Sequence, residues 1–250
     1  MTMALETVAL DKWYGGIHPT NNVSLQVEKG ARRALIGPNG AGKTTLINLV
    51  TGVVRPSAGQ VLLDGQDITS LKPHARARLG MVRTFQINQL FGDLTPLETL
   101  TLAVSERLRL GTDIWSPVGA KSQIVEEVTE ILQRYRLADV MNERTAILPY
   151  GKQRLLEIAV AVACRPRVLL LDEPAAGVPE DERHDILASI VSLPKDVTVL
   201  LIEHDMDIVF NFADRISVLV NGALFADGTP DEVARDPRVR AIYLGEAADA

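Results

Sequence analysis

The sequence predicts an α/β fold in which a parallel sheet is interrupted by a helical insertion. Short apolar strands alternate with helical segments at both ends of the chain, and residues 72–110 and 121–140 are mainly helical. A glycine-rich turn joins a strand to a helix at residues 37–44. Such alternation is typical of parallel sheets, because each crossover between parallel strands usually needs a helix.

The composition is that of a globular protein with net negative charge. Hydrophobic residues make up 46% of the 250 residues, and the formal net charge is −6. This charge argues against a general binder of nucleic acid or anionic membranes, which needs a basic surface. The single cysteine, Cys164, excludes an intrachain disulfide and is expected to be a core residue. The sequence has no signal-peptide pattern and no apolar run approaching the ~18 residues of a membrane span.

The individual elements follow from local patterns. ETVAL, VSLQVEKG and RRALIGPNG have strand composition, and KTTLINLVTG is helical and ends at Gly52. An apolar stripe predicts that residues 124–135 pack in a core. LPYGKQRLLEIAV predicts a helix that starts near Pro149, and RVLLLDEP, VTVLLIEHD and RISVLVNG predict three further strands. A solvated basic face is predicted for Lys72, Arg76, Arg78 and Arg83.

A phosphate-binding loop is the strongest functional signal. GPNGAGKT at residues 37–44 fits G-x-x-x-x-G-K-[ST] between a strand and a helix. Glycines let backbone N–H groups approach a phosphate, Lys43 supplies a cation to the β- and γ-phosphates, and the Thr44 hydroxyl suits Mg²⁺. The alternative, a structural glycine-rich turn, is disfavoured by the strand and helix that flank it. The residues expected to contact a nucleotide here are Asn39, Gly40, Ala41, Gly42, Lys43, Thr44 and Thr45.

Polar residues follow two of the predicted strands. Open α/β sheets bind ligands at the carboxyl ends of their strands. Asp172 is therefore expected to hold Mg²⁺, and Glu173 to polarise an attacking water. His204 follows the strand VLLIE, where it is suited to hydrogen-bond a γ-phosphate. Taken alone, the acidic pair would be a solvated turn and the histidine a structural residue, but the phosphate loop favours the functional interpretation.

In this order, the motifs resemble an ATP-binding-cassette (ABC) ATPase over essentially the whole chain. The resemblance implies a P-loop NTPase core with a RecA-like parallel sheet, an N-terminal antiparallel β subdomain and an inserted helical subdomain. The expected division places residues 1–86 and 162–250 in the nucleotide-binding core and residues 87–161 in the helical subdomain. ATP and Mg²⁺ are the implied cofactors.

The resemblance also implies further site residues. KWYGG matches the loop whose aromatic residue, here Tyr14, stacks on adenine. Gln86 in RTFQ matches a glutamine that reaches Mg²⁺ and the attacking water, and His204 matches the switch histidine. LPYGKQ stands where the family carries its signature motif, commonly L-S-G-G-Q, which contacts the ATP of the opposite cassette. The matching residues are Pro149, Tyr150, Gly151, Lys152 and Gln153.

The family mechanism implies several partners. Two cassettes stack head to tail, each ATP lies between one phosphate loop and the other signature helix, and closure drives two membrane permease subunits. A heterodimer of cassettes is favoured over a homodimer, and a periplasmic substrate-binding protein takes part indirectly. INQLFGDLTP, which follows Gln86, is expected to contact a permease. The implied location is the cytoplasmic face of the bacterial inner membrane, with no nucleic acid bound.

Four segments narrow the resemblance: LPYGKQRLLEIA, LLLDEPAAGV, LLIEHDMDIV and GTPDEVARDPRVRAIYLGE. They are most similar to ATPase subunits of importers for branched-chain amino acids, which implies uptake of branched-chain or other hydrophobic amino acids. Cassettes for urea or short amides and for lipopolysaccharide export share parts of this pattern. A soluble cassette of DNA repair or translation is disfavoured by the compact length. A regulator without hydrolysis is disfavoured by the presence of Glu173 and His204.

Two departures from the family pattern concern the contacts with the partner cassette. Pro149 replaces the signature serine and Tyr150 the first signature glycine. Pro179 in AAGVPEDE lies near a position that is often aspartate or asparagine. Pro149 is either a helix starter only, or the mark of a half-site that binds ATP through backbone N–H groups and the helix dipole.

Overall fold

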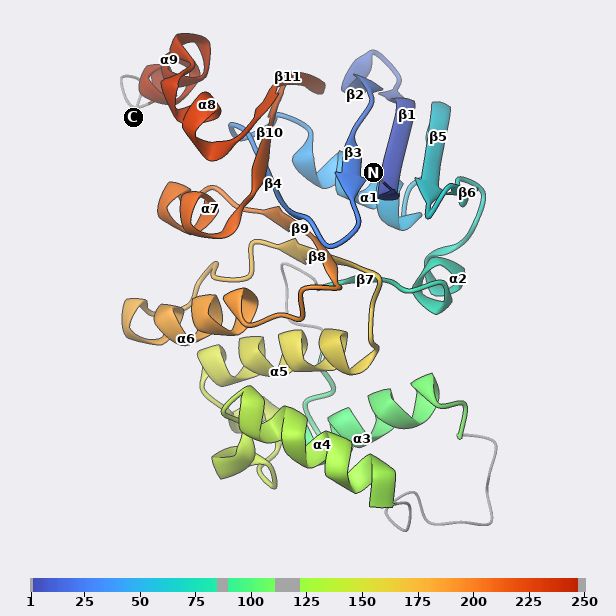
Figure 1. The fold of residues 1–250 in the computed structure, drawn as a ribbon, viewed down its shortest axis with the longest axis vertical. Helices are drawn as coiled ribbons and strands as arrows, with labels where there is room; N and C mark the ends of the chain where they lie inside the picture. The colour runs from blue at the N-terminus through green and yellow to red at the C-terminus, as the bar shows by residue number, and fades with distance from the viewer. Residues whose placement is uncertain (1, 85–89, 111–121, 247–250) are drawn as a thin grey trace. The chain divides into compact units, whose positions relative to one another are not determined.

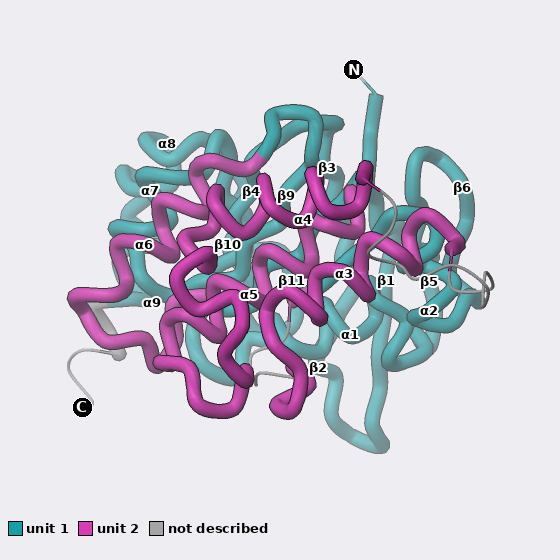
Figure 2. Tube along the Cα trace, turned by 90° about the horizontal axis from the view of Figure 1, so that it is seen from below, with its two compact units in different colours: residues 1–83, 167–173, 194–250 teal, residues 84–166, 174–193 magenta. Residues whose placement is uncertain are grey.

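The computed structural model describes residues 2–84, 90–110 and 122–246 of the chain (Figure 1). The chain divides into two compact units (Figure 2). The first comprises Met1–Arg83, Arg167–Glu173 and Pro194–Ala250, and the second comprises Thr84–Pro166 and Pro174–Leu193. Residues 174–193, which the sequence division places in the nucleotide-binding core, group with the helical residues of the second unit.

A six-stranded sheet forms the centre of the first unit, in the order β11-β10-β4-β9-β8-β7. All neighbouring strands are parallel except β10 and β11, which are antiparallel. The predicted parallel sheet is thereby confirmed, and its strands lie side by side in Figure 1. The strands are β4 (Arg32–Ile36), β7 (Met81–Arg83), β8 (Val168–Asp172), β9 (Thr198–Ile202), β10 (Arg215–Val220) and β11 (Ala223–Gly228).

Both faces of this sheet are covered, which explains why β8 and β9 are buried at every position. Side chains alternate between the two faces along a strand. Leu35 packs in the same cluster as Leu46 of α1 (Lys43–Thr51) and residues of an antiparallel sheet. Ala34 and Ile36 pack in a second cluster with α7 (Met206–Phe212), α8 (Pro230–Arg235) and α9 (Pro237–Glu246).

The antiparallel sheet has the order β2-β1-β5-β6, with β3 pairing with β1. Strand β1 continues through Tyr14, and Tyr14 pairs with Ile17 of β2 across the turn. The predicted strands ETVAL and VSLQVEKG lie on either side of β2, but β2 itself was missed, because IHPTNNV lacks apolar alternation. The strands are β1 (Met3–Tyr14), β2 (Ile17–Val23), β3 (Gln26–Glu28), β5 (Ala58–Leu63) and β6 (Gln66–Asp67).

The second unit is helical. It contains α3 (Pro96–Arg107), α4 (Ser122–Arg134), α5 (Tyr150–Ala163) and α6 (Glu180–Val191), with short 3₁₀ turns at Ala138–Val140 and Thr145–Ile147. Helix α3 packs against α4 and α5, and α5 packs against α6. The apolar stripe predicted for residues 124–135 is buried at each of its five positions: Ile124, Val128, Ile131, Leu132 and Tyr135.

The prediction that residues 72–110 are mainly helical misses a strand between two helices. The first unit contains a short helix, α2 (Pro73–Arg78), and the chain then forms strand β7 before entering the helical unit. Pairing with β8 stabilises β7, and a local pattern of three residues cannot reveal this pairing. None of the helices that the structure describes is both long and apolar enough to cross a membrane.

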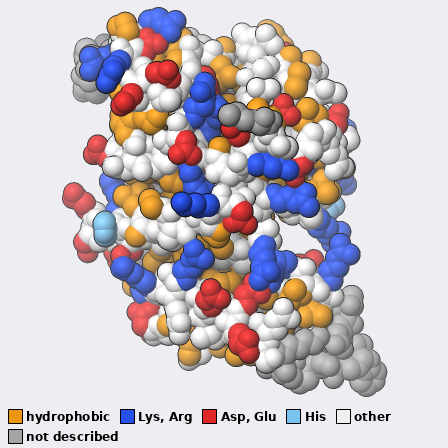
Figure 3. Space-filling view, in the orientation of Figure 1, with side chains coloured by type: hydrophobic (Ala, Val, Ile, Leu, Met, Phe, Trp, Pro, Cys, Tyr) orange, Lys and Arg blue, Asp and Glu red, His pale blue; other side chains and the backbone are white. Residues whose placement is uncertain are grey.

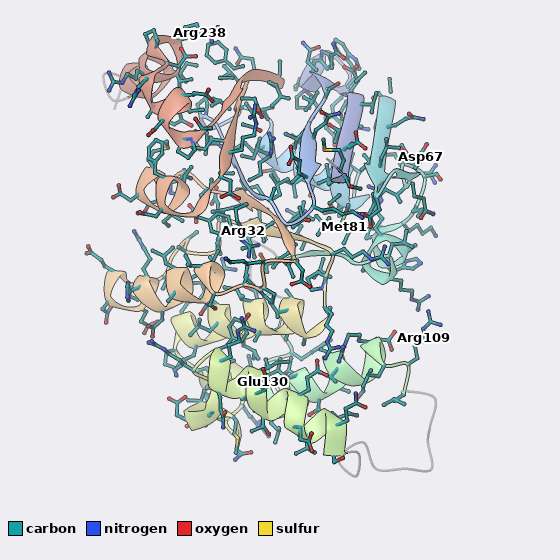
Figure 4. The ribbon with its side chains drawn as sticks, viewed as in Figure 1. Arg32, Asp67, Met81, Arg109, Glu130 and Arg238 are labelled. Atoms are coloured by element: carbon teal, nitrogen blue, oxygen red, sulfur yellow. The ribbon has the colours of Figure 1, made fainter. Side chains whose placement is uncertain are left out.

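Basic and acidic side chains are interspersed on the face of the molecule that Figure 3 shows. The chain has 26 Lys and Arg residues against 32 Asp and Glu residues, so mixing of the two signs is the expected surface. Figure 4 shows several of these charged side chains at their positions in the ribbon, among them Asp67 on β6 and Glu130 on α4.

Candidate functional site

The loop between β4 and α1 has a backbone that only glycine can adopt at its key position. Gly42 caps the N-terminus of α1 with φ of 97°. A Cβ atom at Gly42 would come within 2.0 Å of the Pro19 carbonyl oxygen. The loop therefore lies directly against β2. The neighbouring Gly222 also holds the loop, because its N–H donates to the Ala41 carbonyl at 2.9 Å.

The side chains of this loop are presented on the surface of the first unit. Asn39, Gly40 and Thr44 are exposed, whereas Ala41 is buried. The Lys43 ammonium donates to the Gly37 carbonyl at 2.5 Å and to the Pro38 carbonyl at 3.0 Å, so it lies along the loop. Backbone N–H groups, one cation and one hydroxyl are thus gathered at the N-terminus of α1, which suits an anionic phosphate.

Three strand ends bring further groups to the same edge of the sheet. Leu35 of β4 and Asp172 of β8 both pair with Ile202 of β9. The phosphate loop follows β4, Glu173 follows β8, and His204 stands two residues after β9. The parallel topology therefore places all three segments at the carboxyl edge, as the sequence analysis expected from strand direction.

Glu173 and His204 lie close to each other at this edge. His204 Nδ1 is 3.8 Å from Glu173 Oε1 and 3.8 Å from Glu203 Oε2. The Glu173 backbone adopts φ of 46°, and its N–H donates to the Ile202 carbonyl at 2.9 Å. A left-handed backbone at a non-glycine residue costs energy that the surrounding structure must supply. The His204 side chain is 66% exposed and that of Glu173 is 21% exposed, so both can reach a ligand from solvent.

Asp172 is buried beside an arginine. Its side chain is 6% exposed, and its Oδ2 accepts from Arg83 Nη2 at 2.6 Å. The second amino group of the guanidinium, Arg83 Nη1, donates to Asn48 Oδ1 at 2.7 Å. Sequence reasoning missed both Arg83 and Asn48, because neither belongs to a local motif.

The predicted basic face is wrong for two of its four residues. Arg76 is 1% exposed and the Arg83 side chain is 10% exposed, whereas Lys72 and Arg78 are exposed. The Arg76 guanidinium donates to four backbone carbonyls, those of Leu49, Val50, Thr69 and Leu71. Burial lowers the pKa of Arg76. A buried arginine of this kind supports the C-terminal end of α1 and does not form a surface patch.

Tyr14 stands at the end of β1. Its ring is exposed, and the Lys12 ammonium lies 4.9 Å from the ring centroid. The neighbouring Trp13 stacks on His18 with ring centroids 3.5 Å apart, and His18 Nε2 is 2.6 Å from Asp11 Oδ1. His18 lies on β2, in the hairpin that carries Tyr14. Gln86, which the family resemblance implies reaches Mg²⁺ and the attacking water, lies outside the described residues.

The segment LPYGKQ forms the start of α5 in the second unit. Helix α5 begins at Tyr150, and Pro149 is the N-cap without a side-chain hydrogen bond. The proline therefore precedes the first helical turn and removes no N–H from it. The Gly151 N–H donates to Glu182 Oε2 of α6 at 2.9 Å. Gln153 Nε2 donates to the Leu148 carbonyl at 2.9 Å.

Lys152 and Tyr150 are held by neighbours within the same unit. The Lys152 ammonium donates to Asp139 Oδ1 at 2.9 Å and to the Arg136 carbonyl at 2.5 Å. The bond from Lys152 lowers the pKa of Asp139. The Tyr150 ring lies against Gly177, where an added Cβ would be 3.5 Å from the ring, so the tyrosine packs on the loop AAGVPEDE.

The donor set at the sheet edge suits a divalent cation shared with a nucleotide. Among the residues that the structure describes, no group of three or more His, Cys, Asp and Glu side chains could hold a metal by itself. Mg²⁺ usually takes only one or two protein oxygens and completes its shell with phosphate and water. The Thr44 hydroxyl and the Asp172 carboxylate are oxygen donors of this kind.

Comparison with protein families gives two matches. Residues 20–176 match the model of the ABC transporter family. Residues 223–249 match the model described as branched-chain amino acid ATP-binding cassette transporter.

Named relatives are similar over nearly their full length. The high-affinity branched-chain amino acid transport ATP-binding protein BraF of Pseudomonas aeruginosa is 42% identical, with 97% of this chain and 98% of that protein covered. The corresponding LivG protein of Escherichia coli is 39% identical, with 94% of each chain covered.

Solved structures of cassettes share the fold. A nucleotide-free ATP-binding cassette from an ABC transporter superposes with a TM-score of 0.82 at 34% identity, over 97% of this chain and 99% of that chain. The ADP conformation of an ATP-binding cassette superposes with a TM-score of 0.83 at 34% identity, over 98% and 99%. The phosphate loop, the acidic strand end and these full-length similarities agree, and the chain belongs to the ABC transporter family as an ATP-binding cassette ATPase.

Proposed function

We propose that this chain is the ATP-hydrolysing subunit of an importer for branched-chain or other hydrophobic amino acids. The observation that carries the proposal is the gathering of the phosphate loop, Asp172, Glu173 and His204 at one edge of the parallel sheet. Its substrate class is supported by the match of residues 223–249 and by two relatives named for branched-chain amino acid transport.

In this proposal the phosphate loop and Tyr14 bind ATP. The backbone N–H groups of residues 39–45 surround the phosphates, and Lys43 turns its ammonium toward the β- and γ-phosphates. The exposed ring of Tyr14 stacks on adenine. Thr44, Asp172 and Gln86 hold Mg²⁺, which neutralises charge on the phosphates when it is bound. The loop is held against β2 and Gly222, so it is formed before the ligand arrives.

Glu173 acts as the general base in the proposed hydrolysis. Its carboxylate stands at the end of a buried strand, where the bond to the Ile202 carbonyl fixes its backbone. His204 follows the adjacent strand β9, with its Nδ1 3.8 Å from Glu173 Oε1, and hydrogen-bonds the γ-phosphate in this proposal. Glu173 thus accepts the proton of the attacking water, and His204 donates a hydrogen bond to the phosphate, each from the end of one of two adjacent strands.

The signature helix α5 serves the ATP held by a second cassette. The helix dipole at its first turn favours an anion, and Pro149 contributes no hydroxyl to that contact. The Gly151 N–H donates to Glu182 Oε2, so the Glu182 carboxylate has to move aside before this N–H can meet a phosphate. Lys152 is engaged with Asp139, so its charge is partly compensated. The residues proposed for this contact in trans are Pro149, Tyr150, Gly151, Lys152 and Gln153. A sister cassette is the favoured partner, in keeping with the family resemblance.

A permease is proposed to dock on the second unit near Phe91. Phe91 is 69% exposed and Ile147 is 72% exposed. Their segments are adjacent, because the Ala146 N–H donates to the Gly92 carbonyl at 3.0 Å. Exposed apolar residues of this kind mark interaction surfaces. Docking there would hold the cassette on the cytoplasmic face of the bacterial inner membrane. Cysteines at Leu90 or Phe91 should crosslink to a permease and not to lipid alone.

Transport in proteoliposomes tests the proposal. The chain is assembled with its permeases and sister cassette, ATP is supplied on the cassette side, and uptake of labelled leucine and of urea is compared in the presence of the binding protein. We expect ATP-dependent leucine uptake that disappears with Lys43→Ala and persists with Lys72→Ala, an exposed lysine outside the site. Urea uptake without leucine uptake would contradict the proposed substrate class. Leucine uptake that is unchanged by Lys43→Ala would contradict the proposed nucleotide site.

A further inference from the structure

Arg83 connects two parts of the nucleotide site that are far apart in the sequence. It is the last residue of β7, two positions after Met81, whose place is labelled in Figure 4. One amino group of its guanidinium contacts Asn48 on α1, and the other contacts Asp172 at the end of β8. The planar guanidinium can serve two partners at once, which a lysine cannot do with the same geometry.

Both charges of the Arg83–Asp172 pair are removed from solvent. The exposed fractions of the two side chains are 10% and 6%. Removing one partner from a buried ion pair leaves an uncompensated charge, which costs much more than losing a surface ion pair. The carboxylate of Asp172 therefore needs a positive charge beside it, and Arg83 supplies one from within the protein.

The second contact extends this effect to the phosphate loop. Asn48 follows Thr44 by four positions on α1, so the two side chains lie on the same face of that helix. The guanidinium thereby links the helix that carries Thr44 to the strand that carries Asp172. These two residues are the described members of the proposed Mg²⁺ ligand set.

We propose that Arg83 is a positioning residue that acts as the resident cation of the Mg²⁺ site. It holds Asp172 Oδ2 and α1 in place, and an arriving Mg²⁺ has to share the carboxylate with the guanidinium. Free Mg²⁺ is strongly hydrated and gives up its water reluctantly. The guanidinium beside Asp172 reduces the attraction of the carboxylate for a second cation, so this attraction alone does not offset the loss of that water. The site accordingly takes up Mg²⁺ together with the phosphates of ATP. This inference rests on the proposed role of Asp172 as a metal ligand.

Thermal unfolding without nucleotide tests the inference, with MgCl₂ as the probe. The parent chain is compared with Arg83→Lys and Arg83→Gln, each measured with and without Mg²⁺. We expect a graded response: almost no Mg²⁺ effect in the parent, an intermediate rise in the melting temperature of Arg83→Lys, and the largest rise in Arg83→Gln. For Arg83→Gln the rise should be about 3–6 °C at a Mg²⁺ concentration about tenfold above its Kd.

The variant Asp172→Asn combined with Arg83→Gln is the matched control, because it removes the carboxylate that the metal would bind. We expect this double variant to lose the Mg²⁺ response. Equal responses in the parent and Arg83→Gln, or a response that survives Asp172→Asn, would overturn the inference. If Arg83→Gln folds only with Mg²⁺, the stabilisation by Mg²⁺ is larger than expected, and this outcome supports the inference. If it folds in neither condition, Arg83→Lys decides, and an absent Mg²⁺ response in that variant overturns the inference.

A separate measurement distinguishes this failure from failure of the proposed function. Binding of ATP to the parent chain and to Asp172→Asn is titrated with and without Mg²⁺. Mg²⁺-dependent binding that is unchanged by Asp172→Asn would remove the proposed metal role of Asp172 itself. Suppose instead that Asp172→Asn abolishes Mg²⁺-dependent binding of ATP, while the parent, Arg83→Lys and Arg83→Gln show the same Mg²⁺ effect on melting temperature. That result would contradict only the role proposed for Arg83.

Discussion

The backbone N–H of Gly151 donates to the Glu182 carboxylate at 2.9 Å, so a residue of α6 caps the first turn of α5. Both helices belong to the second compact unit. A negative charge at a helix N-terminus is stabilising, because it satisfies an N–H group that has no partner within the helix. The segment LPYGKQ is thereby joined to the segment AAGVPEDE, and these are the two places where the chain departs from the family pattern.

Substitution of Gly151 should disturb this cap. A Cβ atom there would come within 2.0 Å of Glu182 Oε2, so Gly151→Ala has to displace the carboxylate. We expect the free energy of unfolding to fall by about 1–2 kcal/mol, the range for loss of a helix cap. Denaturant unfolding measures this change. Combined with Glu182→Ala, the two losses should be less than additive, because either substitution already breaks the same contact. Fully additive losses would show that Gly151 and Glu182 do not stabilise the protein through their mutual hydrogen bond.

Substitution of Arg76 should lower stability without touching the nucleotide loop. The guanidinium donates to four backbone carbonyls and is 1% exposed, so Arg76→Met leaves buried acceptors unpaired. We expect a loss of about 2–4 kcal/mol in the free energy of unfolding, given the cost of unsatisfied buried groups. Arg78→Met on the same helix is the matched control, since Arg78 is exposed. Equal effects of the two substitutions would contradict this account of Arg76.

Cys164 should react slowly with alkylating reagents in the folded protein. Burial raises the pKa of its thiol, because the thiolate is the form that loses hydration. The reactive thiolate is therefore less populated in the folded chain than in the unfolded chain at the same pH. The alkylation rate of the folded chain should accordingly increase at a higher pH than that of the unfolded chain. Alkylation by iodoacetamide, followed across pH in native and denatured protein, measures this displacement. Identical pH profiles would contradict the burial effect.

Phe91 offers a prediction about coupling to the membrane subunits. It is 69% exposed and stands in the segment proposed to meet a permease, so Phe91→Ser should weaken assembly of the complex by removing apolar contact area. We expect at least a tenfold loss in the affinity between cassette and permease, an order of magnitude set by hot-spot residues. Val191→Ser, at an exposed apolar position on α6, is the control. Unchanged ATP binding by the isolated chain would show that the Phe91 substitution leaves the fold intact.

The sheet edge could be predicted from sequence because its determinants are local. Continuous apolar runs mark strands buried on both faces, and parallel strands bring their carboxyl ends to one edge. The positions of Lys43, Glu173 and His204 followed from these two rules. The glycine pattern of the loop needed no tertiary information, since Gly42 occupies a backbone conformation that its sequence context already requires.

Other features depend on contacts that no local pattern encodes. Arg76 and Arg83 were predicted to form a solvated patch because no local pattern shows that they are buried. Two of the four carbonyl partners of Arg76 lie 26 and 27 positions away, and the two side-chain partners of Arg83 lie 35 and 89 positions away. Strand β7 has only three residues and exists because β8 pairs with it. Likewise, Glu182 caps α5 from 31 positions further along the chain, a contact made only after α5 and α6 pack together.

Glu173→Gln is the most direct test of the central claim that this chain hydrolyses ATP with Glu173 as the base. The substitution keeps the size and shape of the side chain, but it replaces one carboxylate oxygen with an NH₂ group and removes the basicity. In the assembled transporter, we expect ATP to bind with nearly the parental affinity while the rate of hydrolysis falls by about 10²-fold or more, the range for loss of a general base. Parental hydrolysis rates with Glu173→Gln would contradict the assignment and with it the proposed division of roles at the sheet edge.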